Sequence, residues 1–195
     1  MTDQRTIDVY NEKAADYAKM TAKAKPDADL KRFMNALPAN ARVLDLGCGP
    51  ATSSAHMRNA GFRPDPVDAS PAMVALANET HDIGARLGTF DDIAGSYDAV
   101  WANFSLLHAA ADDLPRYIQM IADTLPKGGV LHMGMKTGSG TSRDALDRRY
   151  TYVTVESLHD LLTTAGFTVT NTRTGVDKAL AGTDDPYVIC LSKKA

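Results

Sequence analysis

Two acidic residues and a glycine pair stand where a chain could bind a nucleoside. Asp45 ends a buried apolar run, and Gly47-Cys48-Gly49 follows it. Asp68 ends the next strand-like run. Glycine allows close approach of the backbone, because it has no Cβ atom, and the N–H groups at a helix start favour anionic groups. A carboxylate at the second strand end can accept both ribose hydroxyls. This order of strand, acid, glycine loop, helix, strand and acid predicts a nucleoside-containing cofactor.

The same residues discriminate between two cofactors. A nicotinamide dinucleotide requires Gly-x-Gly-x-x-Gly, but Thr52 stands at the third position, and Asp45 would repel a pyrophosphate. S-adenosylmethionine has no phosphate, and its ammonium group suits an acid beside the loop. The sequence therefore favours S-adenosylmethionine. The alternatives are a short nicotinamide oxidoreductase, which lacks an obvious Tyr-x-x-x-Lys pair here, and a non-catalytic cofactor-binding protein.

The elements that position these residues alternate between strand and helix. Helical faces recur in the first 38 residues, where Ile7, Tyr10, Ala14 and Tyr17 share one face. Strands are expected at residues 43–46, 63–67, 85–88, 97–102, 130–135, 167–172 and 187–191, and further helices at 51–60, 71–80, 114–125 and 154–165. This alternation predicts an α/β fold with a mostly parallel sheet covered on both faces. The last two strands are expected to be antiparallel neighbours, because the segment 174–186 between them carries no helical pattern.

Composition limits the class of protein. The chain has 195 residues and 44% hydrophobic residues, which suits one globular domain. Its net charge of −3 gives no support for nucleic-acid binding. Cys48 and Cys190 are far apart and no metal-ligand spacing occurs. With no apolar leader or membrane-length run, the sequence predicts a cytoplasmic protein without a metal or a membrane partner.

Several segments resemble those of class I S-adenosylmethionine-dependent methyltransferases. The segments are "VLDLGCGPAT" (43–52), "PVDAS" (66–70), "SYDAVWANFSLLHA" (96–109), "LPKGGVLHMGMK" (125–136) and "VYNEKAADYAKM" (9–20). The resemblance implies a Rossmann-like sheet of seven strands in the order 3-2-1-4-5-7-6, with the last strand antiparallel. It also implies one domain over residues 1–195, with a helical cap at 1–38 over the cofactor and a core at 39–195.

The resemblance carries roles for individual residues toward the cofactor. Gly47, Cys48 and Gly49 should line the methionine part, with Asp45 near its ammonium and Asp68 on the ribose. The remaining cofactor contacts are expected from Tyr17, Ala69, Ser70, Met73, Phe90, Asn103 and Leu106. The family often has an acid that accepts from the adenine amine. Here that position is Thr89, or Asp91 if the loop is shifted by two residues.

The segment 136–154 follows the fifth strand and is basic, aromatic and rich in glycine and serine. We expect it to form a substrate-side loop that binds an anionic or planar small molecule, because arginine suits carboxylate or phosphate bidentately. The substrate-side candidates are His108, Lys136, Arg143, Arg149, Tyr150 and Tyr152. The alternative is a solvated loop whose arginines form salt bridges to Asp144 and Asp147.

The sequence therefore predicts a methyltransferase that acts on a small molecule by in-line displacement at the sulfonium methyl. It does not identify the acceptor atom, which could be oxygen, nitrogen, sulfur or a metalloid, and it assigns no catalytic residue. Cys48 has no evident base nearby in the sequence. The tetrapeptide Asp184-Asp185-Pro186-Tyr187 is similar to the Asp-Pro-Pro-Tyr signature of amino-group methylation. It precedes the last strand rather than following the fourth, so it is not assigned that role.

Overall fold

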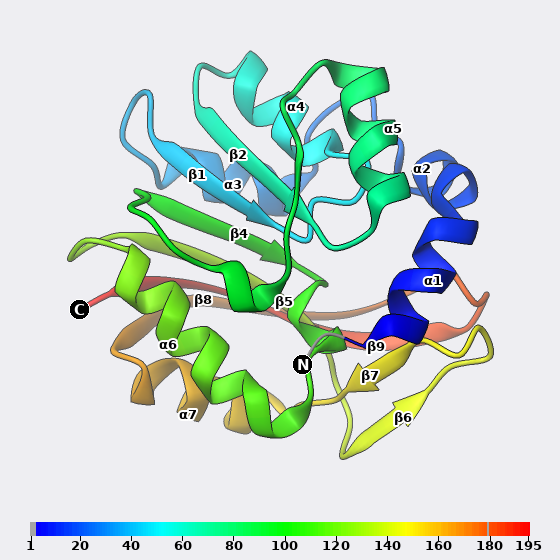
Figure 1. The fold of residues 1–195 in the computed structure, drawn as a ribbon. Helices are drawn as coiled ribbons and strands as arrows, with labels where there is room; N and C mark the ends of the chain where they lie inside the picture. Colours follow the sequence, from blue (N-terminus) through cyan, green and yellow to red (C-terminus); the bar gives the residue numbers. More distant parts are fainter. Residues whose placement is uncertain (1–2, 179) are drawn as a thin grey trace.

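A seven-stranded sheet organises the computed structural model, which describes residues 3–178 and 180–195 (Figure 1). Its strands are β1 (Arg42–Leu46), β2 (Arg63–Asp68), β3 (Arg86–Leu87), β4 (Ala99–Asn103), β5 (Val130–Lys136), β8 (Phe167–Lys178) and β9 (Asp184–Lys194). The order is β3-β2-β1-β4-β5-β9-β8, and β9 runs antiparallel to both of its neighbours. The predicted fold class and strand order are confirmed. The two strands expected as the sixth and seventh are numbered β8 and β9, because two additional short strands, β6 (Thr141–Arg143) and β7 (Arg149–Thr151), precede them and form a separate hairpin.

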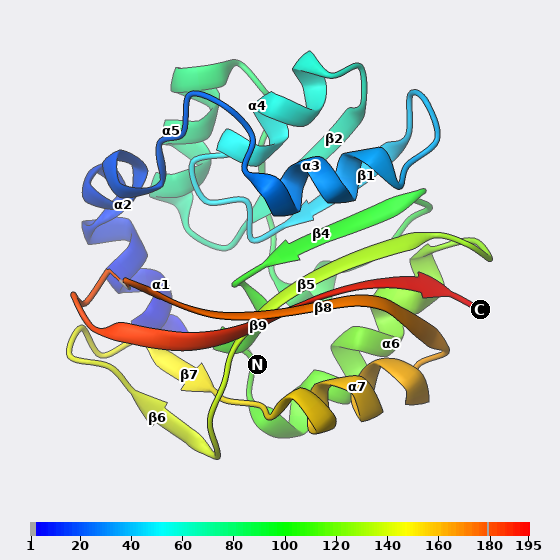
Figure 2. The same cartoon turned by 180° about the vertical axis from the view of Figure 1, so that it is seen from behind.

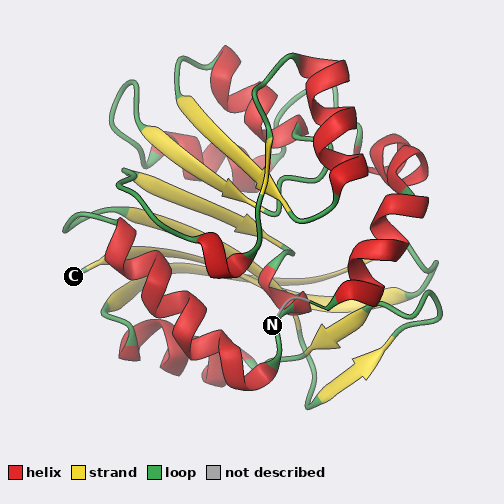
Figure 3. Cartoon of the chain, viewed as in Figure 1, coloured by secondary structure: helices red, strands yellow, loops and turns green. Residues whose placement is uncertain are grey.

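Helices cover both faces of this sheet (Figure 3). The α-helices are α1 (Gln4–Glu12), α2 (Ala14–Thr21), α3 (Ala28–Asn35), α4 (Thr52–Asn59), α5 (Pro71–His81), α6 (Leu114–Thr124) and α7 (Val155–Thr164), and the 3₁₀ turns are η1 (Phe90–Asp92), η2 (Leu106–His108) and η3 (Ala111–Asp113). Local sequence sets several of the boundaries. The Ser70 hydroxyl accepts the N–H of Met73, and Pro71 opens α5. Within the described residues, every helix is too short or too polar to cross a bilayer.

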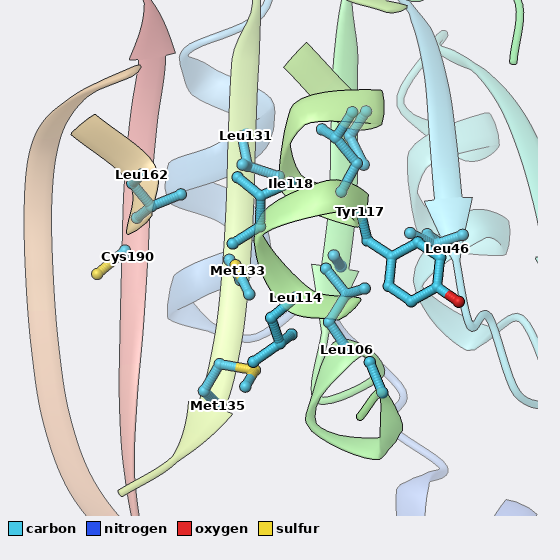
Figure 4. Packing of buried hydrophobic residues seen from close by; sticks show 14 of the residues in the cluster. Leu46, Leu106, Leu114, Tyr117, Ile118, Leu131, Met133, Met135, Leu162 and Cys190 are labelled. Atoms are coloured by element: carbon cyan, nitrogen blue, oxygen red, sulfur yellow. The ribbon is translucent and has the colours of Figure 1, made fainter. Parts of the chain in front are cut away.

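Two apolar clusters hold the layers together. On one face, Ile118 of α6 and Leu162 of α7 pack on Leu131 and Met133 of β5 (Figure 4). On the other face, Phe33 of α3 packs against a cluster formed by the strand residues Val43, Ala99, Trp101 and Val130. Burial of these apolar side chains is the main favourable term for the fold, at about 25 cal/mol per Å². The sheet is therefore anchored from both sides, and the loops at its ends are left to form a site.

Three segments differ from the sequence expectation. The predicted loop at 174–186 is largely strand, because β8 and β9 continue to pair from Gly175↔Tyr187 to Lys178↔Asp184. One side of that ribbon is open to water, so it lacks the apolar run that identifies a buried strand. The expected loop at 136–154 contains the β6–β7 hairpin, held by cross-strand pairing. The N-terminal helical face is divided at Lys13 into α1 and α2.

The carboxyl ends of the parallel strands share one edge of the sheet. Figures 1 and 2 show α1 and α2 lying across this edge, with the β6–β7 hairpin and the tip of the β8–β9 hairpin beside them. Ligands of open α/β sheets bind at this edge. The glycine loop after β1 opens onto it, so the search for a site begins there.

Candidate functional site

Two adjoining cavities lie at the carboxyl edge of the sheet. The first cavity, of about 90 Å³, lies among the ends of β1 and β2, η1 and α1. The second cavity, of about 390 Å³, lies among the ends of β1, β4, β5 and β9 and the connection from α2 to α3. They share the lining residues Tyr10, Tyr17, Gly47, Gly49, Asn103, Phe104 and His108. The glycine loop is therefore the junction between the two cavities.

Backbone geometry explains both glycines of this loop. Gly47 has φ +76° and Gly49 has φ +53°, in the left-handed region that side chains disfavour. A Cβ atom on Gly47 would lie 2.4 Å from the Cβ of Ser105, and one on Gly49 would lie 3.3 Å from the Tyr17 ring. The loop can thus pass close to Ser105 at Gly47 and beneath Tyr17 at Gly49 only because these two positions lack a Cβ atom. The N–H groups of Gly47 and Cys48 donate to the Val67 carbonyl oxygen at 2.8 and 3.0 Å, so they hold the loop against β2 and, contrary to the sequence expectation, are not free to bind an anionic group.

Asp68 ties the glycine loop to the start of α5. Its Oδ2 accepts the N–H of Gly49 at 2.8 Å, and its Oδ1 accepts the N–H of Ser70 at 2.9 Å. Burial raises the pKa of this carboxyl, although the backbone N–H groups oppose the shift. Asp68 lines the first cavity. A carboxylate held in this way can still accept further hydrogen bonds from a ligand's hydroxyls.

Asp45 lies on the other side of the loop and lines the second cavity only. Its carboxylate accepts the Ser54 hydroxyl at 2.7 Å and is 2% exposed. Burial raises its pKa to about 7, with a further contribution from the negative charge of Asp68. Cys48 beside it also lines the second cavity, and burial raises the pKa of its thiol. A thiol in this state is a poor nucleophile.

The far end of the first cavity is built from α5 and η1. Its lining includes Ala69, Ser70, Met73, Thr89 and Phe90. Thr89 therefore faces the cavity, whereas Asp91 accepts from Arg116 at 2.7 Å and from the Tyr117 hydroxyl at 3.1 Å. Thr89 and Asp91 were the two alternatives for the residue that contacts the adenine amine, and of these only Thr89 lines the cavity.

Leu106 differs from the expectation that it lies along the cofactor. Its side chain is fully buried in the core and lines neither cavity. The reason is that η2 turns Leu106 into the sheet, while the next residue, Leu107, lines the second cavity. Asn103 at the end of β4 lines both cavities.

A buried polar chain forms part of the shared wall. His108 Nδ1 lies 2.6 Å from the carbonyl oxygen of Arg149, which can only accept, so this nitrogen carries the proton. The Tyr10 hydroxyl therefore donates to His108 Nε2 at 2.9 Å and accepts from Arg148 at 3.0 Å. Burial lowers the pKa of His108 to about 3, so the ring is neutral at pH 7. Both ring nitrogens are engaged, which leaves His108 no lone pair for a substrate proton.

The structure separates the predicted substrate residues into two groups. Lys136 and Tyr150 line the second cavity, as does His108. Arg143, Arg149 and Tyr152 line neither cavity. Their placement therefore differs from the expectation that they face an acceptor.

Contacts of the β6–β7 hairpin explain this difference. Arg143 forms an ion pair with Asp3 at 2.9 Å, and a guanidinium N–H of Arg149 donates to the carbonyl oxygen of His108 at 3.0 Å. Arg148, which was not a candidate, is 2% exposed and pairs with Asp144 at 2.6 Å. The predicted salt bridges to Asp144 and Asp147 thus form within the hairpin segment, from Arg148 and, at 3.4 Å, from Arg143. The contacts of Arg143 with Asp3 and of Arg149 with the His108 carbonyl fasten the hairpin to the start of α1 and to η2.

Several residues of the second cavity were not predicted as site residues. They are Tyr10, Trp101, Phe104, Arg148, Asp185 and Tyr187. Two of these residues, Asp185 and Tyr187, belong to the tetrapeptide 184–187 that resembles the amino-methylation signature. That role was not assigned to it because it precedes the expected last strand. The β8–β9 hairpin brings it to the site, where the rings of Tyr187 and Phe104 meet edge to face, with centroids 5.6 Å apart.

The whole arrangement suits a ligand with a nucleoside at one end and a zwitterionic group at the other. The first cavity offers an apolar pocket and the Asp68 carboxylate, which can accept hydrogen bonds from ribose hydroxyls. The glycine loop lets a ligand approach the backbone closely at Gly47 and Gly49, and Asp45 lies beyond it beside the second cavity. The residues present therefore fit S-adenosylmethionine, whose charged amino-acid end would reach the junction of the cavities.

Comparison with known proteins identifies the family of the chain. The profile of a family described as "Methyltransferase domain" matches residues 17–172, which is more than half of the chain. The chain therefore belongs to the methyltransferase-domain family, within the class I S-adenosylmethionine-dependent group. S-adenosylmethionine is the cofactor of this class, and the family does not support the nicotinamide alternative.

Individual relatives are distant. A malonyl-[acyl-carrier protein] O-methyltransferase of Enterobacter lignolyticus is 33% identical over 105 residues, which are 51% of this chain and 41% of the relative. The chain spans less than half the length of the curated relatives it matches.

Solved structures share the fold. An S-adenosylmethionine-dependent methyltransferase of Methanosarcina mazei has a TM-score of 0.76 at 15% identity, over 87% of this chain and 98% of that chain. A 1,6-didemethyltoxoflavin-N1-methyltransferase of Burkholderia thailandensis, solved with 1,6-didemethyltoxoflavin and S-adenosylhomocysteine, has a TM-score of 0.74 at 20% identity, over 98% of this chain and 88% of that chain.

Proposed function

We propose that this chain is an S-adenosylmethionine-dependent methyltransferase whose acceptor is a small molecule. The observation that carries the proposal is the junction of the two cavities at the Gly47–Gly49 loop. The adenosine part would occupy the first cavity, with its ribose on Asp68. The methionine part would cross the loop, with its ammonium group toward Asp45. This places the methyl group at the opening of the second cavity.

The residues of the chain have three tasks in this proposal. When bound, S-adenosylmethionine supplies an electrophilic methyl group on a sulfonium sulfur. The glycine loop and Asp68 orient it, and Tyr17 of α2 covers the loop. The second cavity holds the acceptor against the methyl group and limits access of water. Methyl transfer depends strongly on such positioning, because the reacting atoms must be close and in line.

The helices of residues 1–38 are proposed to act as a cap within a single domain spanning residues 1–195. Tyr10 and Tyr17 of this segment meet edge to face, with ring centroids 5.5 Å apart, and both line the two cavities. Residues 39–195 would form the core that binds the cofactor from beneath. Removal of the segment should therefore weaken cofactor binding rather than only expose the acceptor cavity.

The size of the second cavity supports a small acceptor. Its volume of about 390 Å³ falls in the range of pockets for small ligands, about 300–1,000 Å³. Two of the curated relatives are named O-methyltransferases, for malonyl-[acyl-carrier protein] and for ubiquinone biosynthesis. These names support transfer to oxygen.

Calorimetry with S-adenosylmethionine, S-adenosylhomocysteine and NAD tests the cofactor assignment. We expect binding of the first two and little affinity for NAD. Transfer of a labelled methyl group to a panel of hydroxylated and aminated metabolites then tests turnover. Binding without turnover on any acceptor would favour a non-catalytic cofactor-binding protein, and binding of NAD alone would contradict the proposal.

A further inference from the structure

A lysine–aspartate pair lies in the wall of the second cavity. The Lys136 ammonium donates to the Asp185 carboxylate, and both residues line the cavity. The two side chains are only 10% and 24% exposed. The ammonium also lies 3.6 Å from the centroid of the Tyr150 ring. The pair is therefore fixed in position but still accessible from the cavity.

The pair lies on the acceptor side of the proposed cofactor. Lys136 ends β5 and is paired in register with Tyr187 of β9, and β5 lies beside β4. The glycine loop follows β1, on the other side of β4. A methyl group delivered at the end of β4 would thus face the end of β5 and the start of β9, where Lys136 and Asp185 lie.

Aromatic side chains give this part of the cavity a flat, apolar lining. Phe104 at the end of β4 and Tyr187 of β9 are in edge-to-face contact, and Tyr150 lies beneath the ammonium. Aromatic rings stabilise planar ligands by offset stacking or edge contacts, at about 0.5–1.5 kcal/mol beyond area burial. A planar acceptor suits such a lining better than a flexible aliphatic one.

We propose that Lys136 and Asp185 are catalytic residues that ionise an acidic hydroxyl group, phenolic or enolic, on a planar acceptor. This inference rests on the proposed methyltransferase function. The hydroxyl proton passes to the Asp185 carboxylate, and Lys136 faces the resulting oxygen anion. A lone pair of that oxygen forms the new O–C bond to the methyl carbon. The S–C bond breaks, and its electron pair stays on sulfur. Asp185 returns the proton to water after the methyl ether leaves.

Charge balance is the physical reason for assigning the two residues together. Before proton transfer the cavity holds an ammonium, a carboxylate and a neutral hydroxyl. After transfer it holds an ammonium, a neutral carboxylic acid and an oxygen anion. The net charge is unchanged, so the step avoids placing an unpaired charge in a poorly solvated site, which is costly.

The same pair argues against other acceptor groups. A carboxylate acceptor is already ionised and would be repelled by Asp185. An aliphatic amine gains nothing from a neighbouring ammonium. Two buried polar groups of the same wall are already committed, since His108 bonds Tyr10 and the Arg149 carbonyl, and Arg148 bonds Asp144. The cavity also has a Lys23–Asp27 pair, but its side chains are 56% and 39% exposed, so Lys136 and Asp185 are the better shielded pair to serve the acceptor.

A spectroscopic experiment tests the anion site without turnover. The full chain is mixed with S-adenosylhomocysteine and 4-nitrophenol or 4-nitrocatechol, at a pH where the free probe is un-ionised. We expect the absorbance band of the nitrophenolate in the wild-type protein. Lys136→Met should lower phenolate affinity at least tenfold, about 1.4 kcal/mol. Lys193→Met, on the exposed far end of β9, should keep the band. No band in the wild-type protein, or a band retained in Lys136→Met, overturns the proposal.

Turnover tests the proton acceptor. Asp185→Asn should keep phenolate affinity but slow methylation of the un-ionised phenols at least tenfold. This is below the usual rate contribution of a general base, about 10²–10⁴-fold. Its neighbour Asp184 does not line the cavity and provides the matched control, Asp184→Asn. Equal rates for Asp185→Asn and the wild type would overturn the role of Asp185.

Two further measurements separate this proposal from a merely structural ion pair. Because Lys136→Met leaves a carboxylate without its partner, the double variant Lys136→Met/Asp185→Asn is also measured, and it should fold but lack the phenolate band. Calorimetry with S-adenosylhomocysteine should give the same Kd for every variant. Failure of the wild type to bind S-adenosylhomocysteine contradicts the proposed function itself. Normal binding with no phenolate band contradicts only the acceptor proposal.

Discussion

Replacement of Asp68 by alanine should affect both the fold and cofactor binding. The two carboxylate oxygens have separate partners, because Oδ2 accepts from Gly49 and Oδ1 from Ser70. The side chain therefore fixes the glycine loop relative to the start of α5. Deleting it leaves both N–H groups without their acceptor and removes the proposed ligand of the ribose.

The magnitude follows from these two bonds. A hydrogen bond to a charged group contributes about 1.5–3 kcal/mol, and neighbouring bonds do not add fully. Since water from the cavity can replace part of the loss, we expect the free energy of unfolding to fall by about 2–4 kcal/mol. The affinity for S-adenosylhomocysteine should fall by at least tenfold, which corresponds to about 1.4 kcal/mol. Asp68→Asn keeps only one acceptor oxygen, so it should lose roughly half of each effect.

Urea unfolding and calorimetry measure the two effects separately. Each variant is unfolded alone and in the presence of saturating S-adenosylhomocysteine, and the Kd is determined on the folded protein. If Asp68→Ala unfolds and binds like the wild type, the carboxylate neither orders the loop nor holds the ribose. Loss of stability with an unchanged Kd would restrict Asp68 to the structural role.

Three further predictions concern the loop, the core and pH. Burial raises the pKa of Asp45 to about 7 in the folded state, above its value of 3.8 when unfolded, so the folded protein becomes less stable as pH rises from about 4 to 7. Asp45→Asn lacks this titration, so the free energy of unfolding of the wild type should fall relative to that of the variant over this range. Urea unfolding at several pH values measures the difference. Gly47→Ala should abolish binding of S-adenosylhomocysteine, because the new Cβ atom would lie 2.4 Å from the Cβ of Ser105. Gly61→Ala is the control, since Gly61 also has a positive φ, +89°, but open space around it, and it should destabilise by only about 1 kcal/mol. Ile118→Ala should cost about 2–5 kcal/mol of stability, and Gln119→Ala on the exposed side of α6 less than about 0.5 kcal/mol, in the same unfolding assay.

Local signals in the sequence predicted the parts of the candidate site that depend on short stretches of chain. The run from Asp45 to Gly49 predicted a strand, a loop and a helix, because its requirements lie within a few residues, and Asp68 was expected at the end of the next strand. The cap formed by Ser70 was predicted for the same reason. These are properties of backbone conformation and of local hydrogen bonds, so they need no knowledge of distant segments.

The acceptor side could not be predicted in the same way. Arg143 and Arg149 have the chemistry to bind an anion, but Asp3 and the carbonyl oxygen of His108 engage them across the tertiary structure. Lys136 kept the position predicted for it, at the end of a strand. Its partner Asp185 is distant in sequence, and only the β8–β9 hairpin brings it to the cavity.

The sequence alone thus determined the fold class, because the alternation of strand and helix patterns is local. The sheet order was implied by the family resemblance, and the glycine positions predicted the loop after β1. Tertiary structure alone decided which charged side chains face the cavity and which are neutralised by partners. The physical reason is that a charge at a partly buried position is stabilised by whichever opposite charge or carbonyl oxygen the fold places nearby. That choice is made between segments far apart in the chain, as for Lys136 with Asp185 and Arg143 with Asp3.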